Sequence, residues 1–332
     1  MNLKLSAIAA AALLGTLASA HAQWQPNKPI TIIVPWAAGG STDQVTRVTA
    51  AELEKHLNQK IVVLNQPGAS GSVGTKNALE APKDGYTWAA GGAKDLGTYR
   101  VLGMVDTGAK DWNLYINVAY IAVVGVNADA PYKTMTELLE AMKARPGAIP
   151  VATAGVNSSG HAAIEAIARA TGTSYKHVTY DGGNPAVIAT VSGETQVTTQ
   201  LAAEQTDMIR AKRIRPLAVV GDKSLEIEGY GTIPPLSQFI PGFKDPINYF
   251  GIFVPPGVPA DVTRTLDRIW ATEMVKSDAL RKYAAGRGAM FAPMAGEEAQ
   301  RAVFPAIQAY AWTQQAAGKA KVSPDTVGIP KP

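Results

Sequence analysis

The chain has 332 residues, of which 46% are hydrophobic, and it carries a formal charge of +4 without any cysteine. The lack of cysteine excludes disulfides and thiol chemistry, and the length suffices for two domains whose cores need no cross-links. Apart from one basic cluster at 210–215, the positive charges are scattered. Such a cluster is typical of a solvated helix end, so nucleic-acid binding is not expected.

The first 22 residues read as a secretory signal. Lys4 precedes an apolar stretch at 5–17, and Ala20-His21-Ala22 forms a small-x-small cleavage site before Gln23. The alternative is an N-terminal membrane anchor, but the stretch is short for a span and no stop-transfer charges follow it. No later segment approaches the roughly 20 unbroken apolar residues that a span requires. We therefore expect residues 1–22 to be removed on export, leaving a soluble protein.

The most informative segment of the mature chain is 29–43. A β-branched run from Ile30 to Val34 predicts a buried strand that stops at Pro35. A loop of small residues follows, and a helical pattern opens at Asp43. Free N–H groups and the helix dipole point into a turn of this kind. Strand, loop and helix together therefore predict half of a carboxylate-binding clamp.

Short apolar runs alternate with helical patterns along the rest of the chain. The apolar runs predict strands at 61–64, 87–90, 120–126, 149–154, 177–180, 195–199, 215–220 and 250–254. The helical patterns predict helices at 46–57, 136–144, 158–170, 186–191, 260–276, 279–285 and 297–315. This alternation favours an α/β protein with parallel sheets and helical crossovers.

Two of the predicted strands, 120–126 and 250–254, each lead into a turn rich in Asn, Asp or Pro. If both cross between lobes, residues 23–122 and 250–332 form lobe 1, and residues 123–249 form lobe 2. Ligands of open α/β sheets bind outside the carboxyl ends of the strands. We therefore expect the loops that follow strands to line a cleft between the lobes.

Four such loops lie at 36–43, 91–94, 154–161 and 180–185. The first and third are chemically alike, because each places glycine and small hydroxyl residues before a helix start. Hydroxyls there can donate to a carboxylate beside the free N–H groups, although helix capping alone is the alternative explanation for each loop. With one such loop in each proposed lobe, we expect both to grip the same anion.

Several motifs follow one another in order along nearly the whole mature chain. They lie at 28–30, 34–43 with Arg47, 62–74, 84–87, 154–161, 178–183 and 250–257. In this ordered set the chain resembles the Bug-type solute receptors of tripartite tricarboxylate transporters. The resemblance implies an α/β, two-lobed periplasmic binding protein fold, each lobe a mainly parallel sheet flanked by helices, joined by two hinge strands. It also implies a periplasmic receptor that closes on a small carboxylate and delivers it to membrane permease subunits.

The resemblance further implies that backbone N–H groups, hydroxyls and ordered waters hold the ligand, rather than an arginine fork. The residues concerned come from the four loops and from the strand near 200: Trp36, Ala38, Gly39, Gly40, Ser41, Thr42, Asp43, Gly92, Val156, Asn157, Ser158, Ser159, His161, Tyr180, Asp181, Gly182 and Gln200. Two of them have a second interpretation. His161 is also a candidate structural hydrogen-bonder at a helix start, and Asp43 a helix N-terminal carboxylate favoured by the dipole.

Several positions depart from the family pattern and leave the ligand open. Trp36 replaces a smaller aromatic residue, and Asp181 stands where lysine is frequent. Lys94 is a candidate partner for a second carboxylate, with a solvated lysine as the alternative. Dicarboxylates, tricarboxylates, aromatic carboxylates and amino acids all remain open. The rings of Trp36, Tyr249 and Phe250 favour a planar aromatic carboxylate, unless they serve only to pack the core.

The alternative function is that of a hydrolase-like enzyme using serine and histidine of the cleft. Ser41, Ser158 and Ser159 are available, but the mature chain has few histidines and no Gly-x-Ser-x-Gly elbow. Without cysteine or a close histidine pair, no metal is expected. The glycine-rich loops lack a Walker lysine and a dinucleotide fingerprint, so no cofactor is expected either. We therefore expect a binding protein rather than an enzyme, which saturable binding without turnover would show.

Overall fold

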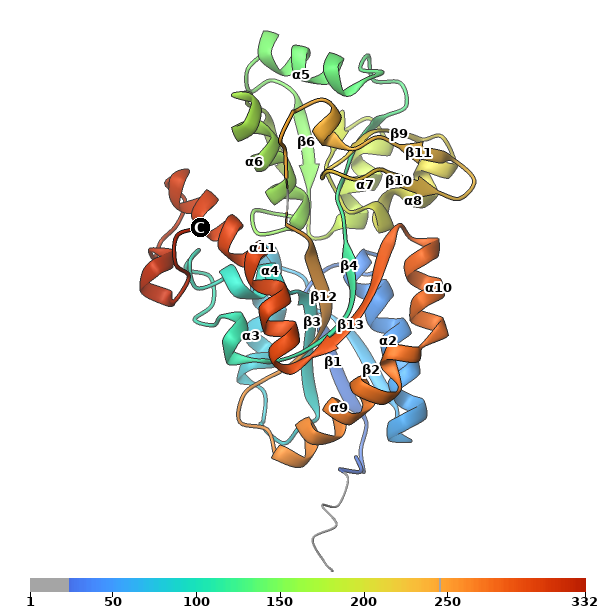
Figure 1. Ribbon diagram of the computed structural model, residues 1–332, viewed down its shortest axis with the longest axis vertical. Helices are drawn as coiled ribbons and strands as arrows, with labels where there is room; N and C mark the ends of the chain where they lie inside the picture. Colours follow the sequence, from blue (N-terminus) through green and yellow to red (C-terminus); the bar gives the residue numbers. More distant parts are fainter. Residues whose placement is uncertain (1–23, 245) are drawn as a thin grey trace, which may run out of the picture.

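Two β-sheets, each covered by helices, form the two lobes of the molecule (Figure 1). The computed structural model describes residues 24–244 and 246–332, so the predicted signal at 1–22 lies outside it. Lobe 1, the lower half of the view, has six strands in the order β13-β4-β12-β3-β1-β2. Their bounds are β1 Ile30–Val34, β2 Ile61–Asn65, β3 Thr87–Gly92, β4 Asn113–Tyr120, β12 Asn248–Val254 and β13 Ala289–Ala295.

Lobe 2, the upper half of the view, has a five-stranded sheet in the order β7-β6-β8-β5-β9 and a separate hairpin, β10-β11. Its strands are β5 Val123–Asn127, β6 Pro150–Thr153, β7 Lys176–Thr179, β8 Val197–Thr198, β9 Ile214–Val219, β10 Leu225–Ile227 and β11 Gly231–Ile233. The chain enters this lobe where β4 leads into β5, and it returns to lobe 1 at β12 (Figure 1).

Both sheets are mixed, whereas the alternation of elements predicts mainly parallel sheets. In lobe 1, β1 pairs parallel with β2 and β3, but β12 pairs antiparallel with β3 and β4, as does β13 with β4. In lobe 2, β6 pairs parallel with β7 and β8, but β5 pairs antiparallel with β8 and β9. The cause is the connection between lobes, because the chain leaves along β4 and re-enters along its antiparallel neighbour β12.

Helices cover the outer faces of both sheets. Lobe 1 carries α2 Ser41–Leu57, α3 Ser72–Glu80, α4 Ala93–Thr98, α9 Ala260–Thr272, α10 Asp278–Gly286 and α11 Gly296–Ala316. Lobe 2 carries α5 Met135–Ala144, α6 Ser159–Thr171, α7 Gly183–Val191 and α8 Ala202–Arg210. Short 3-10 turns lie at Ala69–Gly71, Ala109–Asp111, Leu236–Gln238, Met274–Lys276 and Pro324–Val327. None of the helices among the described residues has both the length and the apolar character that a membrane span needs.

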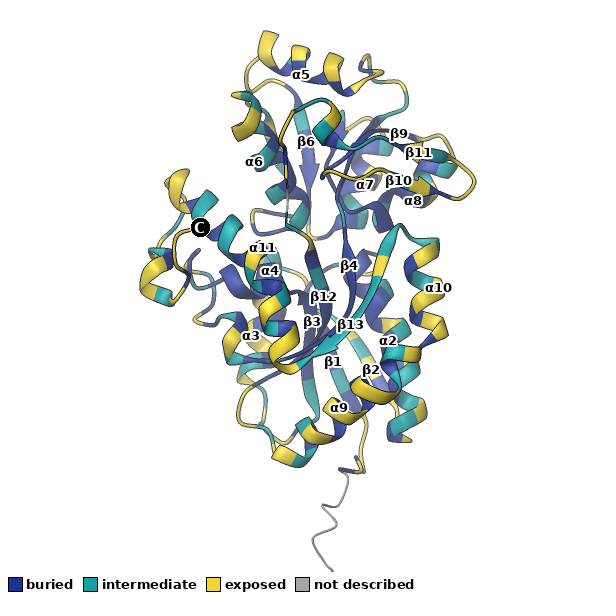
Figure 2. Ribbon diagram, viewed as in Figure 1, coloured by how far each residue is buried: buried dark blue, intermediate teal, exposed yellow. Residues whose placement is uncertain are grey.

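The central strands of both sheets, such as β3, β4, β5 and β12, are almost wholly buried, whereas the edge strand β13 and the outer faces of α5, α9 and α10 are not (Figure 2). The largest core residues of lobe 1 are anchored by polar contacts as well as by packing. Trp270 is buried, and its Nε1 donates to the carbonyl of Ile116 at 2.7 Å. Trp88 is also buried, and its Nε1 donates to the carbonyl of Gly85 at 2.8 Å. This lobe carries loop one, at 36–43.

Most predicted elements are confirmed within a few residues. Some have different bounds in the structure, and some elements of the structure have no counterpart among the predicted ones. The strand expected at 120–126 covers the end of β4 and the start of β5, which are separate strands in separate sheets. The helix expected to open at Asp43 begins at Ser41. The segment 91–94 is not a loop, because it contains the end of β3 and the start of α4. The sequence pattern does not predict helices α3, α4 and α8 or strands β10, β11 and β13.

Candidate functional site

A small cavity lies between the lobes, where the first turns of several helices meet. Its walls come from α2, α4, α6, α7 and α8, from the residues before them and from β12: Trp36, Gly40, Ser41, Thr42, Asp95, Ala154, Ser158, Ser159, Gly183, Gln200, Leu201, Glu204 and Phe250. The cavity volume is about 20 Å³, which is room for about one water molecule. Helix N-termini favour anions, so the backbone N–H groups around this cavity favour a negative charge.

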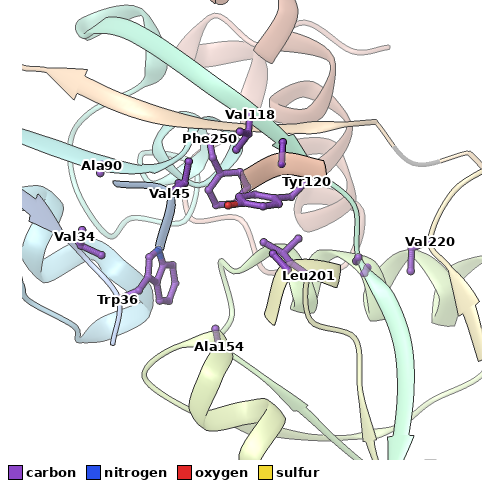
Figure 3. Close-up of a cluster of buried hydrophobic side chains, with 14 of the residues drawn as sticks. Val34, Trp36, Val45, Ala90, Val118, Tyr120, Ala154, Leu201, Val220 and Phe250 are labelled. Carbon is purple, nitrogen blue, oxygen red and sulfur yellow. The ribbon is translucent and has the colours of Figure 1, made fainter. Parts of the chain in front are cut away.

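Apolar side chains of both lobes close one wall of the site. Figure 3 shows Trp36, Tyr120 and Phe250 of lobe 1 on one side, with Leu201 and Ala154 of lobe 2 opposite them. All five belong to one buried hydrophobic cluster that spans the lobes. The rings of Tyr120 and Phe250 meet edge to face, with centroids 4.8 Å apart. Trp36 and Phe250 therefore both pack in the core and line the cavity.

Loop one is held in shape by Asp43. Its carboxylate accepts hydrogen bonds from the Gly39 N–H at 2.9 Å, from Asn65 Nδ2 at 3.0 Å and from Arg47 Nε at 3.1 Å. Burial alone raises the pKa of Asp43, but the bonds from Arg47, Gly39 and Asn65 outweigh it and leave the pKa below its ordinary value. Asp43 thus orients loop one, while the N-terminal turn of α2 at Ser41 and Thr42 faces the cavity.

Loop three, at 154–161, leads into α6 on the opposite wall of the cavity. Ser158 is the N-cap, since its Oγ accepts from the His161 N–H at 3.2 Å and donates to the carbonyl of Gly155 at 2.8 Å. The Oγ of Ser159 accepts from Nδ2 of Asn248, in lobe 1, at 2.8 Å. First-turn N–H groups of a helix have no acceptor within the helix. Loop three therefore presents the kind of amide donors that loop one presents across the cavity.

Asn157 joins loop three to lobe 1 rather than lining the cavity. Its carbonyl accepts from Lys94 Nζ at 2.5 Å, its Oδ1 accepts from Thr98 Oγ1 at 2.8 Å, and its Nδ2 donates to the carbonyl of Asp95 at 3.0 Å. Lys94 also forms an ion pair with Asp95 at 2.7 Å. Both side chains are almost fully buried, so Lys94 is not the solvated lysine considered from the sequence. Burial raises the pKa of Asp95 despite this lysine.

Glu204 in the first turn of α8 reaches across the cavity to loop one. Its Oε1 accepts from the N–H of Ser41 at 3.1 Å and from Ser41 Oγ at 2.9 Å, and its Oε2 accepts from the N–H of Leu201 at 3.2 Å. In the amide orientation that satisfies both ends, Gln200 donates to Oε2 at 3.0 Å and accepts from the Ala154 N–H at 2.6 Å. Burial raises the pKa of Glu204, and the Ser41 bonds oppose that rise.

Several expected ligand-binding residues lie beside the cavity or away from it. Gly92 packs beneath it, where a Cβ would lie 3.0 Å from the ring of Phe250. Gly39 and Gly182 lie where loops of the two lobes touch: a Cβ on Gly39 would lie 3.1 Å from Asn184, and one on Gly182 would lie 3.0 Å from Ala37. Ala38 is exposed at the surface. These positions shape the loops rather than facing the cavity.

Val156, Tyr180 and Asp181 line a separate, larger cavity of about 580 Å³, whose lining also includes Ala69 and Ser70 of lobe 1. The side chain of Val156 is 40% exposed. Tyr180 donates its hydroxyl to Glu194 Oε1 at 2.8 Å, and the Asp181 carbonyl accepts from the Ala37 N–H at 3.0 Å. The structure thus places these residues at the rim between the lobes and not at the small cavity.

His161 faces away from the small cavity, toward α11. Its Nδ1 contacts the carbonyl of Val156 at 2.8 Å, its Nε2 lies 3.4 Å from Glu165 Oε1, and its ring stacks on His177 with centroids 4.3 Å apart. The hydrogen bond with His161 is the main cause that lowers the pKa of Glu165 to about 2. This environment matches the structural hydrogen-bonder interpretation of His161.

His177 makes stability depend on pH. The pKa of His177 is lowered from 6.5 to about 4, mainly by burial and to a smaller extent by the neighbouring His161. The folded state then binds fewer protons than the unfolded state, so stability is lost as pH falls from about 6.5 toward about 4. We expect the His177→Gln variant to show a smaller fall in melting temperature across this range than the wild type. Parallel pH profiles for the two proteins would contradict this role of His177.

The comparison with known proteins identifies the family. Residues 45–313 match the model of the tripartite tricarboxylate transporter family receptor, TctC. The chain belongs to this receptor family. A protein of Pseudomonas sp. (strain P51), described as a UPF0065 protein in the tcbD-tcbE intergenic region, is 31% identical to the receptor. That similarity covers 78% of this chain and 79% of the Pseudomonas protein.

Solved structures share the fold of the receptor. An R. palustris protein with adipate has a TM-score of 0.80 and 25% identity, covering 88% of this chain and 98% of that chain. MatC from Rhodopseudomonas palustris with bound malate has a TM-score of 0.78 and 20% identity, covering 87% of this chain and 99% of that chain. The second likeness shows the fold alone. The receptor therefore has a two-lobed periplasmic binding protein fold.

The chain belongs to a family of solute receptors, which bind their ligands and do not catalyse a reaction. The hydrogen bonds of two serines in the site are consistent with this. Ser41 Oγ donates to Glu204, and Ser158 Oγ donates to the carbonyl of Gly155. Among the residues that the structure describes, the hydrogen-bond partners of these two serine hydroxyls are therefore groups other than the ring of His161. The described part of the chain contains no group of three or more His, Asp or Glu side chains that is placed to hold a metal.

Three residues of the cavity wall lie outside every candidate loop and site residue of the sequence analysis: Asp95, Leu201 and Glu204. Asp95 lies three residues after a Gly-Gly pair that is typical of a turn, so the sequence gives no signal for its helix. Glu204 stands three residues after Leu201, which is the spacing of a glutamate that reaches back to the N-cap N–H. That spacing was the available signal, but no Ser, Thr, Asp or Asn cap precedes it.

Proposed function

We propose that this receptor captures a small organic carboxylate between its two lobes and delivers it to the permease subunits of a tripartite tricarboxylate transporter. One observation carries the proposal: the N-terminal turns of α2, from lobe 1, and α6, from lobe 2, face the same cavity. Each turn supplies amide donors and a serine hydroxyl. A single carboxylate that accepts from both is bound more tightly by the closed form than by an open one.

A dicarboxylate is the ligand class that the relatives favour. The R. palustris structure contains adipate, and the structure of MatC contains malate. In this receptor one carboxylate would accept from Ser41 and Ser159, and the apolar walls formed by Trp36 and Phe250 would contact the carbon chain. A concave site with apolar walls and a few placed polar groups is the usual form of a small-molecule site.

Export to the periplasm belongs to the same proposal. The family is one of periplasmic receptors, and residues 1–22 have the pattern of a secretory signal. The mature protein would then begin near Gln23. A preparation from the periplasm whose N-terminal sequence starts there would support this part of the proposal, and retention of residues 1–22 in a membrane fraction would contradict it.

Ligand-biased hinge closure is the mechanism that follows from the topology. Lobe 1 would comprise 23–122 and 250–332, lobe 2 would comprise 123–249, and the hinges would lie near the β4–β5 connection and the start of β12. Rotation at a few residues of this kind is the usual motion of two-lobed receptors. The small volume of the cavity supports it, because a ligand larger than one water molecule requires the lobes to open.

Screening with organic acids tests the function. We expect at least one acid among malate, adipate, citrate, benzoate and aspartate to raise the melting temperature, because a ligand of the native state stabilises it by mass action. Calorimetry should then give saturable binding, and the acid should emerge chemically unchanged. Turnover of the acid, or a flat response to the whole panel and to its homologues, would contradict the proposal.

A further inference from the structure

The carboxylate of Glu204 occupies the position at which the proposed function places the headgroup of the ligand. It comes from α8 in lobe 2 and accepts both the N–H and the Oγ of Ser41, at the N-terminus of α2 in lobe 1. These are the donors that loop one offers to an anion. A protein carboxylate therefore already makes the contact between lobes that an external carboxylate would make.

The surrounding backbone is shaped for this carboxylate. A Cβ on Gly183, at the start of α7, would lie only 2.0 Å from Glu204 Oε1, and one on Gly40 would lie 3.5 Å from the same atom. The glycines let Oε1 lie directly against the first turns of α2 and α7. The second oxygen, Oε2, is held by the Leu201 N–H and by the amide of Gln200. Both carboxylate oxygens are thus hydrogen-bonded, and the small cavity beside them has no room for a second carboxylate.

We propose that Glu204 is an internal competitor of the ligand: its carboxylate joins the two lobes through Ser41, and a carboxylate ligand binds by displacing it from Ser41. This inference rests on the proposed function for the identity of the ligand. Two carboxylates cannot share the Ser41 donors at close range without electrostatic cost. The measured association constant is therefore the intrinsic one multiplied by the fraction of receptor in which Glu204 has released Ser41.

Glu204 also acts as a determinant of affinity through its charge. After displacement it stays near the bound carboxylate, because Oε2 remains within reach of Leu201 and Gln200. Asp95 faces the same cavity, and its charge is paired with Lys94. A ligand headgroup at Ser41 consequently meets one additional negative charge, that of Glu204. Replacing Glu204 by its neutral isostere removes the competition and the repulsion together.

The test compares Glu204→Gln with the wild type and with Glu140→Gln, which removes an exposed carboxylate of α5. Calorimetry with malate and with adipate should show binding about tenfold tighter in Glu204→Gln, as expected for the loss of a competing charged hydrogen bond. Small-angle scattering without ligand should show a larger radius of gyration for Glu204→Gln than for either comparison protein, because the contact between lobes is weakened. Unchanged or weaker binding by Glu204→Gln, or an unchanged radius, would overturn the inference.

The two measurements separate this inference from the proposed function. If the wild type and Glu204→Gln bind malate or adipate equally and have equal radii, the receptor function stands and the role of Glu204 as a competitor is wrong. If neither protein binds any acid of the panel while the ligand-free Glu204→Gln variant expands, Glu204 does hold the lobes together and the proposed ligand class is wrong.

Discussion

Replacing Ser159 by proline should weaken carboxylate binding by roughly 10- to 100-fold while leaving the fold intact. Ser159 is the first residue of α6, so its N–H has no acceptor within the helix and is available to the ligand. Proline removes that N–H and the hydroxyl. A hydrogen bond to a charged acceptor is worth about 1.5–3 kcal/mol, which corresponds to the expected loss of affinity.

The backbone around Ser159 accepts proline without strain. Proline is favoured at the first position of a helix, provided that the preceding residue is extended. Ser158 meets this condition, with φ −74° and ψ 159°. Two controls isolate the amide. Ser159→Ala keeps the N–H and loses only the hydroxyl, and Ala260→Pro places proline at the start of α9, far from the cavity. Equal dissociation constants for Ser159→Pro and Ser159→Ala in calorimetry would show that the amide does not bind the ligand.

Replacing Lys94 by methionine should lower the free energy of unfolding by about 3–5 kcal/mol, because it leaves a buried carboxylate without its cation. The side chains of Lys94 and Asp95 are 3% and 6% exposed, and Nζ lies 2.7 Å from Oδ1. The ammonium also donates to the carbonyl of Asn157 and lies 4.1 Å from the centroid of the Tyr310 ring. The variant therefore also loses a contact between the lobes.

A surface ion pair supplies the matched control for this stability prediction. Lys76 and Glu80 are 3.7 Å apart, with side chains 58% and 64% exposed. We expect Lys76→Met to cost about 1 kcal/mol or less, because exposed pairs are screened by water. The double variant Lys94→Met/Asp95→Asn should regain part of the loss, since the neutral amide needs no cation. Urea unfolding measures all three, and a Lys94→Met midpoint equal to that of Lys76→Met would contradict the assignment.

The parts of the fold that the sequence predicted are those with strong local signals. The β-branched run of β1 and the serine cap of α6 each determine their structure within a few residues. Strand β13 gave no such signal, because Pro293 interrupts its pattern. It lies at the edge of the lobe 1 sheet, where proline is tolerated, and its register shifts between Phe291 and Met294.

The sequence indicates the two loops that line the cavity but not Asp95 and Glu204, the two carboxylates that line it as well. Loops one and three share a cavity because strand ends and helix starts are local features. Which side chains from other elements enter that cavity depends on tertiary packing. Glu204 is close to loop one only because lobe 2 packs against lobe 1, and Lys94 is buried only because loop three covers α4. The Gly-Gly pair before Lys94 reads as a turn in the sequence, whereas in the structure it ends strand β3 beside Phe250.

A crystal structure of the receptor with bound malate or adipate tests the central idea most directly. We expect one carboxylate of the ligand to lie within hydrogen-bonding distance of both Ser41 in lobe 1 and Ser159 in lobe 2, and Glu204 to be no longer bonded to Ser41. A ligand that touches only one lobe, or that lies in another cavity while Glu204 keeps its place, would show that the two helix starts do not form a shared anion site.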